Sequence, residues 1–211
     1  MKELDGLDIM LDLETLGVNP KAPILSIGVT AFDIHRMEIV HKLELHVSLK
    51  DQLENYNRKV DAETIGWWMN QADDTKTALF NKSTSTVPDY NGGPSKLKDA
   101  LSSISFFIVT KAGEIDVEKR IWANSPAFDC VILKSAYESV IKYENTKNTT
   151  IPWNYNAERD LRTLRRLWGQ KIPETIERGV EHDALSDAIY QSKVCMHILK
   201  DMSLIPIGEK K

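Results

Sequence analysis

The chain has 211 residues, 42% of them hydrophobic and 27% charged, a length and composition typical of one soluble globular domain with a sizeable core. No apolar run reaches the roughly 18 residues of a membrane span, so we expect no membrane partner. The formal net charge of −4 argues against a protein that holds nucleic acid by a bulk positive field alone. Residues 1–5 lack a signal-peptide pattern, and Cys130 and Cys195 lie in apolar stretches, so we expect a cytoplasmic protein without a disulfide framework.

Three predicted strands open the chain. Leu7–Leu13 is apolar throughout most of its length, which is typical of a buried strand. Ile24–Ile34 is rich in β-branched residues, and Glu38–Val47 alternates apolar with polar residues, so both are predicted strands. Because the connections between these segments are short, we expect them to form an antiparallel meander.

The rest of the chain predicts helices alternating with one short strand and polar loops. We expect helices at 62–71 (with Asp61 as N-cap), 73–81, 96–109 (with Ser95 as N-cap), 128–142, 158–168 and 183–202, a strand at 120–123, and loops at 84–94 and 144–150. This order predicts an α/β domain with a mixed sheet. No linker divides the chain, so residues 1–211 are predicted to form a single domain with a core of about 5–204.

The first acidic cluster lies at the carboxyl end of the first predicted strand. Asp12 and Glu14 are two residues apart, so on a strand both side chains point to the same face. Sites in open α/β sheets favour this end of the strands, and two carboxylates are natural ligands for a hard cation. The alternative is a strand end that turns to solvent with two exposed carboxylates.

Two further acidic clusters follow. Asp129 comes five residues after Asn124, in the first turn of a predicted helix, where the helix dipole alone would also favour a carboxylate. His182 and Asp187 begin the last predicted helix, and small and apolar residues flank Asp187, so we expect it to face a specific partner. Four carboxylates brought together would repel one another, and divalent cations would offset that repulsion.

Together, the strand-end Asp-x-Glu, the Asn-x-x-x-Phe-Asp segment at 124–129 and His-x-x-x-x-Asp at 182–187 resemble the motifs of the DEDD family of 3′→5′ exonucleases. The histidine in the third motif is typical of the DEDDh branch. Residues 64–71 and 160–164 further resemble exonuclease VIII-like and bacteriophage exonuclease A-like members. Ser125-Pro126 departs from the pattern expected in the second motif.

This resemblance implies a ribonuclease H-like fold and phosphodiester hydrolysis with two divalent cations, Mg²⁺ or Mn²⁺, about 4 Å apart. The motif match assigns Asp12 to both ions, Glu14 and Asp187 to the ion that holds the attacking water, and Asp129 to the second ion. His182 is expected to accept the proton of that water, because an imidazole can take up a proton near neutral pH.

The resemblance also implies substrate contacts around these motifs. Leu13, Thr15 and Leu16 follow the first aspartate and are expected to pack on the terminal base or sugar. Phe128 either packs in the core or wedges near the scissile end. Asn124 is expected to hold a sugar hydroxyl or a phosphate.

An adjacent tryptophan pair and one arginine complete the predicted substrate contacts. Trp67 and Trp68 cannot share one face of a helix, so one is expected in the core while the other is exposed or stacks on a base, and Trp68 is our candidate for the substrate contact. Arg162 belongs to a basic segment, Glu158–Arg178, which is either a solvated helical face or a substrate contact.

The predicted function is removal of nucleoside monophosphates from the free 3′ end of single-stranded DNA or RNA, with DNA favoured by the bacteriophage-like resemblance. One alternative is an inactive nucleic-acid-binding module of the same fold. Another is an endonuclease or small-nucleotide phosphodiesterase that uses the same metal site. Related enzymes include dimers, so the resemblance leaves a homodimer open.

Overall fold

The computed structural model describes residues 7–84, 93–111, 120–145 and 150–203. Within these ranges five strands form one sheet in the order β3-β2-β1-β4-β5. Their bounds are β1 (Asp8–Thr15), β2 (Ile24–Asp33), β3 (Glu38–His46), β4 (Ile121–Ala123) and β5 (Glu158–Asp160). The first three strands pair antiparallel, whereas β4 pairs parallel to β1 and β5 pairs parallel to β4. The predicted meander and the predicted mixed sheet are confirmed.

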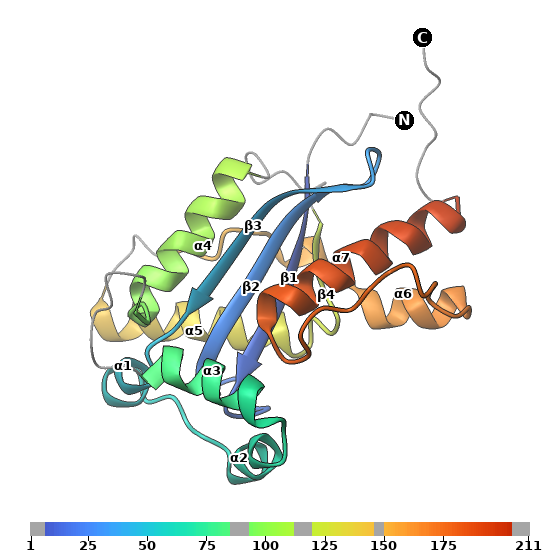
Figure 1. Cartoon of the computed structure of the whole chain (residues 1–211). Helices are drawn as coiled ribbons and strands as arrows, with labels where there is room; N and C mark the ends of the chain where they lie inside the picture. Colours follow the sequence, from blue (N-terminus) through green and yellow to red (C-terminus); the bar gives the residue numbers. More distant parts are fainter. Residues whose placement is uncertain (1–6, 85–92, 112–119, 146–149, 204–211) are drawn as a thin grey trace.

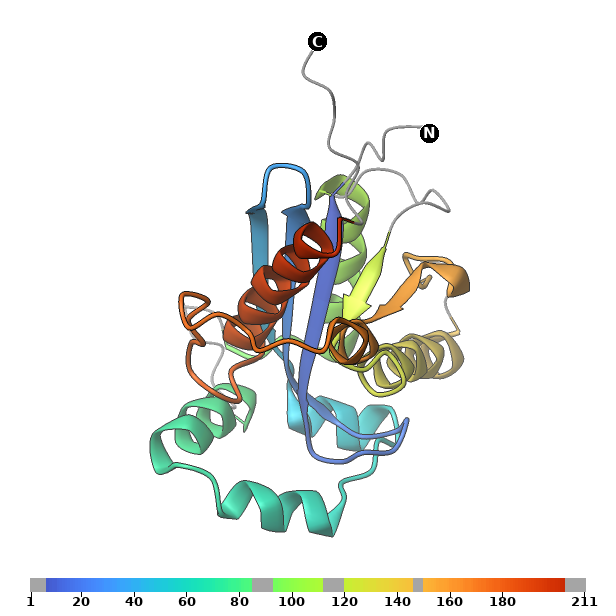
Figure 2. The same ribbon diagram turned by 90° about the vertical axis from the view of Figure 1, so that its right-hand side faces the viewer.

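Helices cover both faces of this sheet (Figure 1). They are α1 (Leu49–Asn55), α2 (Ala62–Met69), α3 (Asp73–Thr84), α4 (Leu97–Lys111), α5 (Asp129–Glu144), α6 (Leu161–Trp168) and α7 (Ala184–Asp201), with a 3₁₀ turn at Tyr155–Ala157. Helix α7 packs on β1, β2 and β3 from one side, while α4 and α5 pack on the sheet from the other. Figure 2 shows the sheet between these layers, with α1, α2 and α3 below it.

Side-chain alternation along β1 divides the core into two layers. Leu11 and Leu13 are buried in the cluster that includes residues of α4 and α5, whereas Met10 is buried in the cluster that includes residues of α6 and α7. Because successive strand residues point to opposite faces, Asp12 and Glu14 lie on the same face as Met10. The acidic pair therefore faces the layer that contains α7.

Helix α7 approaches the sheet closely at Gly28 of β2, which pairs with Asp12 across the β1–β2 ladder. A Cβ atom added to Gly28 would lie 2.0 Å from the carbonyl oxygen of Ala184, so only glycine admits the first turn of α7 at this depth. Farther along, the hydroxyls of Thr30 and Ser192 share a buried hydrogen bond of 2.6 Å. These contacts hold the start of α7 beside Asp12.

Gly28→Ala is expected to destabilise the fold by about 1–3 kcal/mol, because α7 must move to relieve the overlap. Chemical denaturation monitored by circular dichroism measures this change. Gly66→Ala is the matched control, since a Cβ there meets nothing within 4 Å and alanine should stabilise α2 by up to about 1 kcal/mol. Equal denaturation midpoints for Gly28→Ala and the wild type would contradict the close approach described above.

The predicted helix at 158–168 is wrong over its first three residues, which form β5. Asp160 has extended backbone angles, and its side chain accepts a hydrogen bond of 2.7 Å from the backbone N–H of Thr163. A capping aspartate ends the extended segment and begins the helix, so α6 starts at Leu161. The residues before it are then free to pair with β4.

Helix α1 was not predicted. One of its residues, Asp51, accepts a hydrogen bond from the first residue of α4. The carboxylate of Asp51 accepts a hydrogen bond of 2.8 Å from the backbone N–H of Leu97, whereas Ser95 forms a parallel bridge with Val47. The other predicted helices are present with shifted ends. Residues 85–92 and 146–149 of the two predicted loops lie outside the described residues.

No helix in the described ranges is both long and apolar enough to cross a membrane. That residues 1–211 form a single domain stays a prediction.

Candidate functional site

The predicted acidic and histidine residues converge at the carboxyl end of β1. Ligand atoms of Glu14, His182 and Asp187 all lie within 4.8 Å of one another. An oxygen of Asp129 accepts a hydrogen bond of 3.2 Å from the backbone N–H of Leu13, which ties the first turn of α5 to β1. Three segments that are far apart in the sequence therefore meet at one place.

Asp12 lies within the same cluster. Its Oδ1 atom accepts a hydrogen bond of 2.6 Å from the Nε2 atom of Gln191 on α7. Burial raises the pKa of Asp12 well above its ordinary value, and the negative charges of Asp129 and Glu14 raise it further. Asp12 therefore lies close enough to Asp129 and Glu14 for their negative charges to oppose its ionisation.

The neighbouring carboxylates are also difficult to ionise. Burial raises the pKa of Glu14 to about 8, with additional increases from the charges of Asp187 and Asp129. Burial raises the pKa of Asp129 to about 7, although the hydrogen bond from Leu13 and the charge of Arg162 oppose the rise. The cluster offers hard oxygen ligands whose mutual repulsion a divalent cation would offset, so the residues present fit Mg²⁺ or Mn²⁺.

The turn before α5 explains how Ser125-Pro126 is accommodated. The carbonyl oxygen of Ser125 accepts hydrogen bonds from the backbone N–H groups of Phe128, at 2.8 Å, and Asp129, at 3.1 Å. Pro126 lies inside this turn, and its carbonyl oxygen accepts from Val131 at 3.2 Å. Ser125-Pro126 therefore belong to the turn that leads into α5, and Asp129 still contacts β1 through Leu13.

His182 lies immediately before the N-cap of α7, in a left-handed conformation with a φ of 60°. Its backbone N–H donates a hydrogen bond of 3.2 Å to Oδ2 of Asp187. Its ring meets the ring of Trp67 edge to face, with 4.8 Å between centroids. A positive φ is uncommon outside glycine, and here these contacts hold the histidine between α2 and α7.

Arg178 also contacts the acidic cluster, although its place at the end of the basic segment Glu158–Arg178 predicted either a solvated face or a substrate contact. Its Nη2 and Nε atoms lie 3.3 Å and 3.4 Å from Oδ1 of Asp187, and its Nη1 atom lies 2.9 Å from Glu181. The arginine belongs to an irregular segment without periodicity, so no sequence pattern placed it here. Gln191 could have been found, because it follows Asp187 by four residues and helical residues at that spacing share a face.

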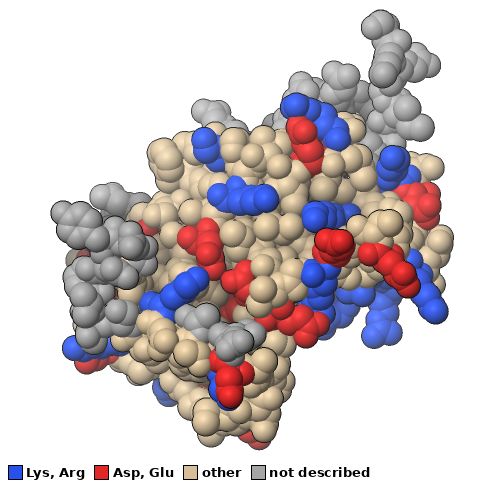
Figure 3. All heavy atoms as spheres, in the orientation of Figure 1, with Lys and Arg blue, Asp and Glu red and all other residues tan. Residues whose placement is uncertain are grey.

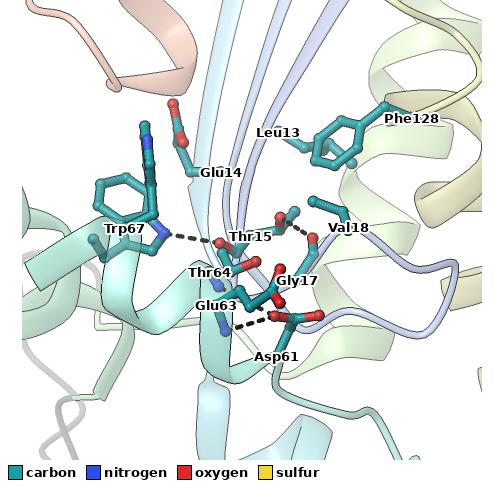
Figure 4. A pocket seen from close by; sticks show the side chains of 11 residues that line it. Leu13, Glu14, Thr15, Gly17, Val18, Asp61, Glu63, Thr64, Trp67 and Phe128 are labelled. Carbon is teal, nitrogen blue, oxygen red and sulfur yellow. Dashed lines mark hydrogen bonds between the residues drawn. The ribbon is translucent and has the colours of Figure 1, made fainter.

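A pocket of about 520 Å³ opens beside the acidic cluster. Its lining residues come from the end of β1, the following loop, α2 and the turn before α5: Leu13, Glu14, Thr15, Gly17, Val18, Asp61, Glu63, Thr64, Trp67, Trp68 and Phe128. Trp67 and Phe128 lie on opposite sides of the pocket in Figure 4, with Glu14 between them. Among the predicted substrate contacts, Leu13, Thr15, Phe128 and Trp68 line the pocket, whereas Leu16, Asn124 and Arg162 do not.

The tryptophan pair divides as the helical geometry predicts. Trp68 is 1% exposed, and its ring N–H donates a hydrogen bond of 2.9 Å to the carbonyl oxygen of Thr15. Leu16 packs with Trp68 in a small apolar cluster. Trp67 is 44% exposed and also lines the pocket, so it, rather than Trp68, offers accessible ring surface there.

Charged side chains are unevenly distributed around the site. In the orientation of Figure 1, acidic side chains gather near the middle of the molecule, and basic side chains are frequent on the side where α6 lies (Figure 3). Arg162, Arg165 and Arg166 are exposed on α6. The backbone N–H of Arg162 donates a hydrogen bond of 3.2 Å to the carbonyl oxygen of Asn124, which ties α6 to the segment before Asp129.

Known proteins of similar sequence and structure are nucleases. An exodeoxyribonuclease of Enterobacteria phage T4 is 25% identical over 203 residues, covering 85% of this chain and 83% of that protein. Exonuclease I of E. coli, solved with a dT13 oligonucleotide, superposes with a TM-score of 0.61 at 12% identity, covering 95% of this chain and 42% of its own. The nuclease domain of 3′hExo, a DEDDh family member bound to rAMP, superposes with a TM-score of 0.51 at 12% identity, covering 98% of each chain.

These structural likenesses confirm the predicted ribonuclease H-like fold, while the chain spans less than half the length of exonuclease I. The exonuclease resemblance is confirmed at the level of the family, and the exonuclease VIII-like or exonuclease A-like subgroup stays a prediction. The model of the 3′-5′ exoribonuclease Rv2179c-like domain matches residues 7–199, nearly the whole chain. The chain therefore belongs to the Rv2179c-like exonuclease family.

Proposed function

We propose that this chain is a metal-dependent 3′→5′ exonuclease that releases nucleoside monophosphates from the 3′ end of single-stranded nucleic acid. The observation that carries the proposal is the convergence of the buried carboxylates of Glu14, Asp129 and Asp187 with Asp12 and His182 at one end of β1. A binding module has no need for such a costly cluster of carboxylates, since burying charge without compensation destabilises a fold.

The proposed mechanism assigns each residue one task. Asp12 would contact both cations, Glu14 and Asp187 would hold one of them, and Asp129 would hold the other. Bound divalent cations supply stabilisation of the attacking and leaving oxygens during phosphodiester hydrolysis. His182 would accept the proton of the attacking water, a task that suits its place within 4.8 Å of the ligand atoms of Glu14 and Asp187.

The pocket beside the cluster is the proposed site of the terminal nucleotide. Its volume and its largely apolar walls suit a nucleobase, and the 44% exposed ring of Trp67 offers a stacking surface. Phe128 stands on the opposite side of the pocket, where it can contact the base or the sugar (Figure 4). The exposed arginines of α6 are proposed to contact phosphates of the remaining strand.

The proposed function leaves open whether the sugar of the substrate is ribose or deoxyribose. The matched family model describes an exoribonuclease, whereas the phage T4 relative is an exodeoxyribonuclease. Both reactions require the same carboxylates and the same proton acceptor, and a 2′-hydroxyl adds only local contacts. We therefore propose single-stranded DNA or RNA as the substrate class.

Matched DNA and RNA oligonucleotides labelled at the 5′ end test this function. With Mg²⁺ or Mn²⁺ we expect a ladder that shortens one nucleotide at a time, and no product in the presence of a chelator. A circular single strand serves as the control, because it has no 3′ end. Cleavage of the circle would overturn the exonuclease assignment and favour an endonuclease, and hydrolysis of dinucleotides alone would favour a small-nucleotide phosphodiesterase.

Trp67→Ala is expected to raise KM for an oligonucleotide about tenfold, because one base–aromatic stack contributes about 1–3 kcal/mol. Trp67→Phe is the matched control, since it keeps an aromatic ring for both the base and His182. Steady-state hydrolysis of a short labelled strand measures KM and kcat separately. A KM for Trp67→Ala equal to that of Trp67→Phe would show that the terminal base does not stack there.

A further inference from the structure

We infer that Gln191 is a positioning residue of the metal centre, holding Asp12 in the orientation that binds cations. This inference rests on the proposed function, and it concerns a residue outside the DEDDh motifs. The side-chain amide of Gln191 donates a hydrogen bond of 2.6 Å from Nε2 to Oδ1 of Asp12. With this contact, α7 reaches the acidic cluster through two successive turns, at Asp187 and at Gln191.

The burial of Gln191 provides the second observation. The residue is 8% exposed, and its Oε1 atom has no hydrogen-bond partner among the described residues. An unpaired buried amide oxygen costs free energy, so such an atom is expected to meet a donor in the working protein. Magnesium retains several of its waters when it binds to proteins, and a cation-bound water is a strong donor. The free oxygen is therefore suited to accept from a water of the metal centre.

Glutamine fits this position better than a charged or apolar residue of similar size. Its two ends can act at once, with the N–H group on Asp12 and the carbonyl oxygen on a metal-bound water. A glutamate would add another negative charge where the pKa of Asp12 is already raised by burial and by its neighbours. An apolar side chain would leave Oδ1 of Asp12 without its donor.

The surrounding contacts limit the movement of Gln191. Helix α7 is held by the close approach at Gly28 and by the buried hydrogen bond between Thr30 and Ser192, the residue that follows Gln191. The backbone that carries the amide is thus fixed to β2, the strand that pairs with β1. Residues that orient metal ligands typically change metal affinity or activity 10–100-fold when removed.

Calorimetric titration of the whole chain with Mn²⁺ tests the inference without relying on activity. Gln191→Met keeps a similar volume but lacks both hydrogen-bonding ends, and we expect it to weaken Mn²⁺ binding about 10–100-fold. Gln191→Asn, whose amide is one methylene shorter, is expected to weaken binding in the same direction. Gln170→Leu is the matched control, because Gln170 also donates to an aspartate, Asp201, but is exposed and remote from the cluster.

Hydrolysis at rising Mn²⁺ concentration provides a second readout. A positioning role predicts that Gln191→Met needs more Mn²⁺ for half its maximal rate and recovers part of its kcat at saturation. Mn²⁺ affinity for both Gln191 variants within twofold of the wild type, with circular dichroism showing folded proteins, would overturn the inference. Intact Mn²⁺ binding with no hydrolysis of any strand by the wild type would instead overturn the proposed function, so the two failures are distinguishable.

Discussion

Asp12→Asn is expected to lower the rate of hydrolysis by at least about 10³-fold, or about 4 kcal/mol of transition-state stabilisation. The asparagine keeps the shape of the side chain but removes the charge that is proposed to face both cations. Its effect on stability is expected to have the opposite sign. In the presence of a chelator at pH 8, the variant should have a larger free energy of unfolding than the wild type.

The sign follows from the raised pKa values. Glu14 and Asp129 have pKa values of about 8 and about 7 in the folded chain, and each would titrate near its lower ordinary value when unfolded. The folded wild type therefore binds more protons between about pH 5 and pH 8, and stability falls by up to about 1.4 kcal/mol per pH unit for each proton concerned. Asp12→Asn removes a carboxyl whose own pKa is raised by burial and by the charges of Asp129 and Glu14, so the variant should flatten this decline.

Denaturant unfolding at pH 5, 6.5 and 8 with a chelator, repeated with Mg²⁺, measures this behaviour. Mg²⁺ should stabilise the wild type most at pH 8 and stabilise Asp12→Asn much less. Asp73→Asn is the matched control, because Asp73 is an exposed aspartate on α3 that pairs with Lys76 and is not a residue of the acidic cluster. Parallel pH profiles for Asp12→Asn and the wild type would show that the folded protein does not raise the pKa of Asp12.

His182→Ala is expected to lower kcat about 10²–10⁴-fold while Mn²⁺ still binds, because general base catalysis typically contributes that factor. The four carboxylates proposed to hold the cations are unchanged in this variant. Single-turnover hydrolysis gives the rate, and calorimetry gives the Mn²⁺ affinity. His35→Ala, at an exposed position in the β2–β3 connection, is the matched control.

The two roles of His182 can be separated. Its backbone N–H, which donates to Asp187, is retained in alanine, so a loss of kcat would arise from the ring. Trp67 contacts that ring, and Trp67→Phe should retain most of kcat. Wild-type kcat for His182→Ala would exclude a general base at this position, and loss of Mn²⁺ binding would assign the ring to the metal centre instead.

Local sequence patterns predicted much of the fold because they reflect short-range constraints. The apolar and alternating strands follow from side-chain periodicity, and they form as predicted. The N-cap of α2 follows from the capping preference of aspartate, and Asp61 occupies it. The boundary at Glu158–Asp160 was wrong because pairing with β4 overrides local helical preference. Helix α1 was missed because seven residues with a single buried glutamine carry little periodic signal.

For the site, the motif residues could be identified from residue type and order, and spacing places Gln191 on the same helical face as Asp187, but the contacts between these residues and their neighbours could not be identified. Spacing alone placed Asp12 and Glu14 on one face of a strand. The contacts of Gln191 with Asp12, of Arg178 with Asp187 and of Trp67 with His182 join different elements. Such pairs have no sequence spacing of their own, because the packing of α7 and α2 around β1 creates them.

The amino-acid sequence thus determined which chemical groups the protein has and which of them lie at strand ends and helix starts. Only the tertiary structure decided that Gly28 admits α7 to the sheet and that Trp67, rather than Trp68, is the exposed tryptophan. The physical reason is that periodicity records the direction of each side chain relative to its own backbone. Depth of packing depends instead on how closely two backbones approach, and segments far apart in the chain determine that distance.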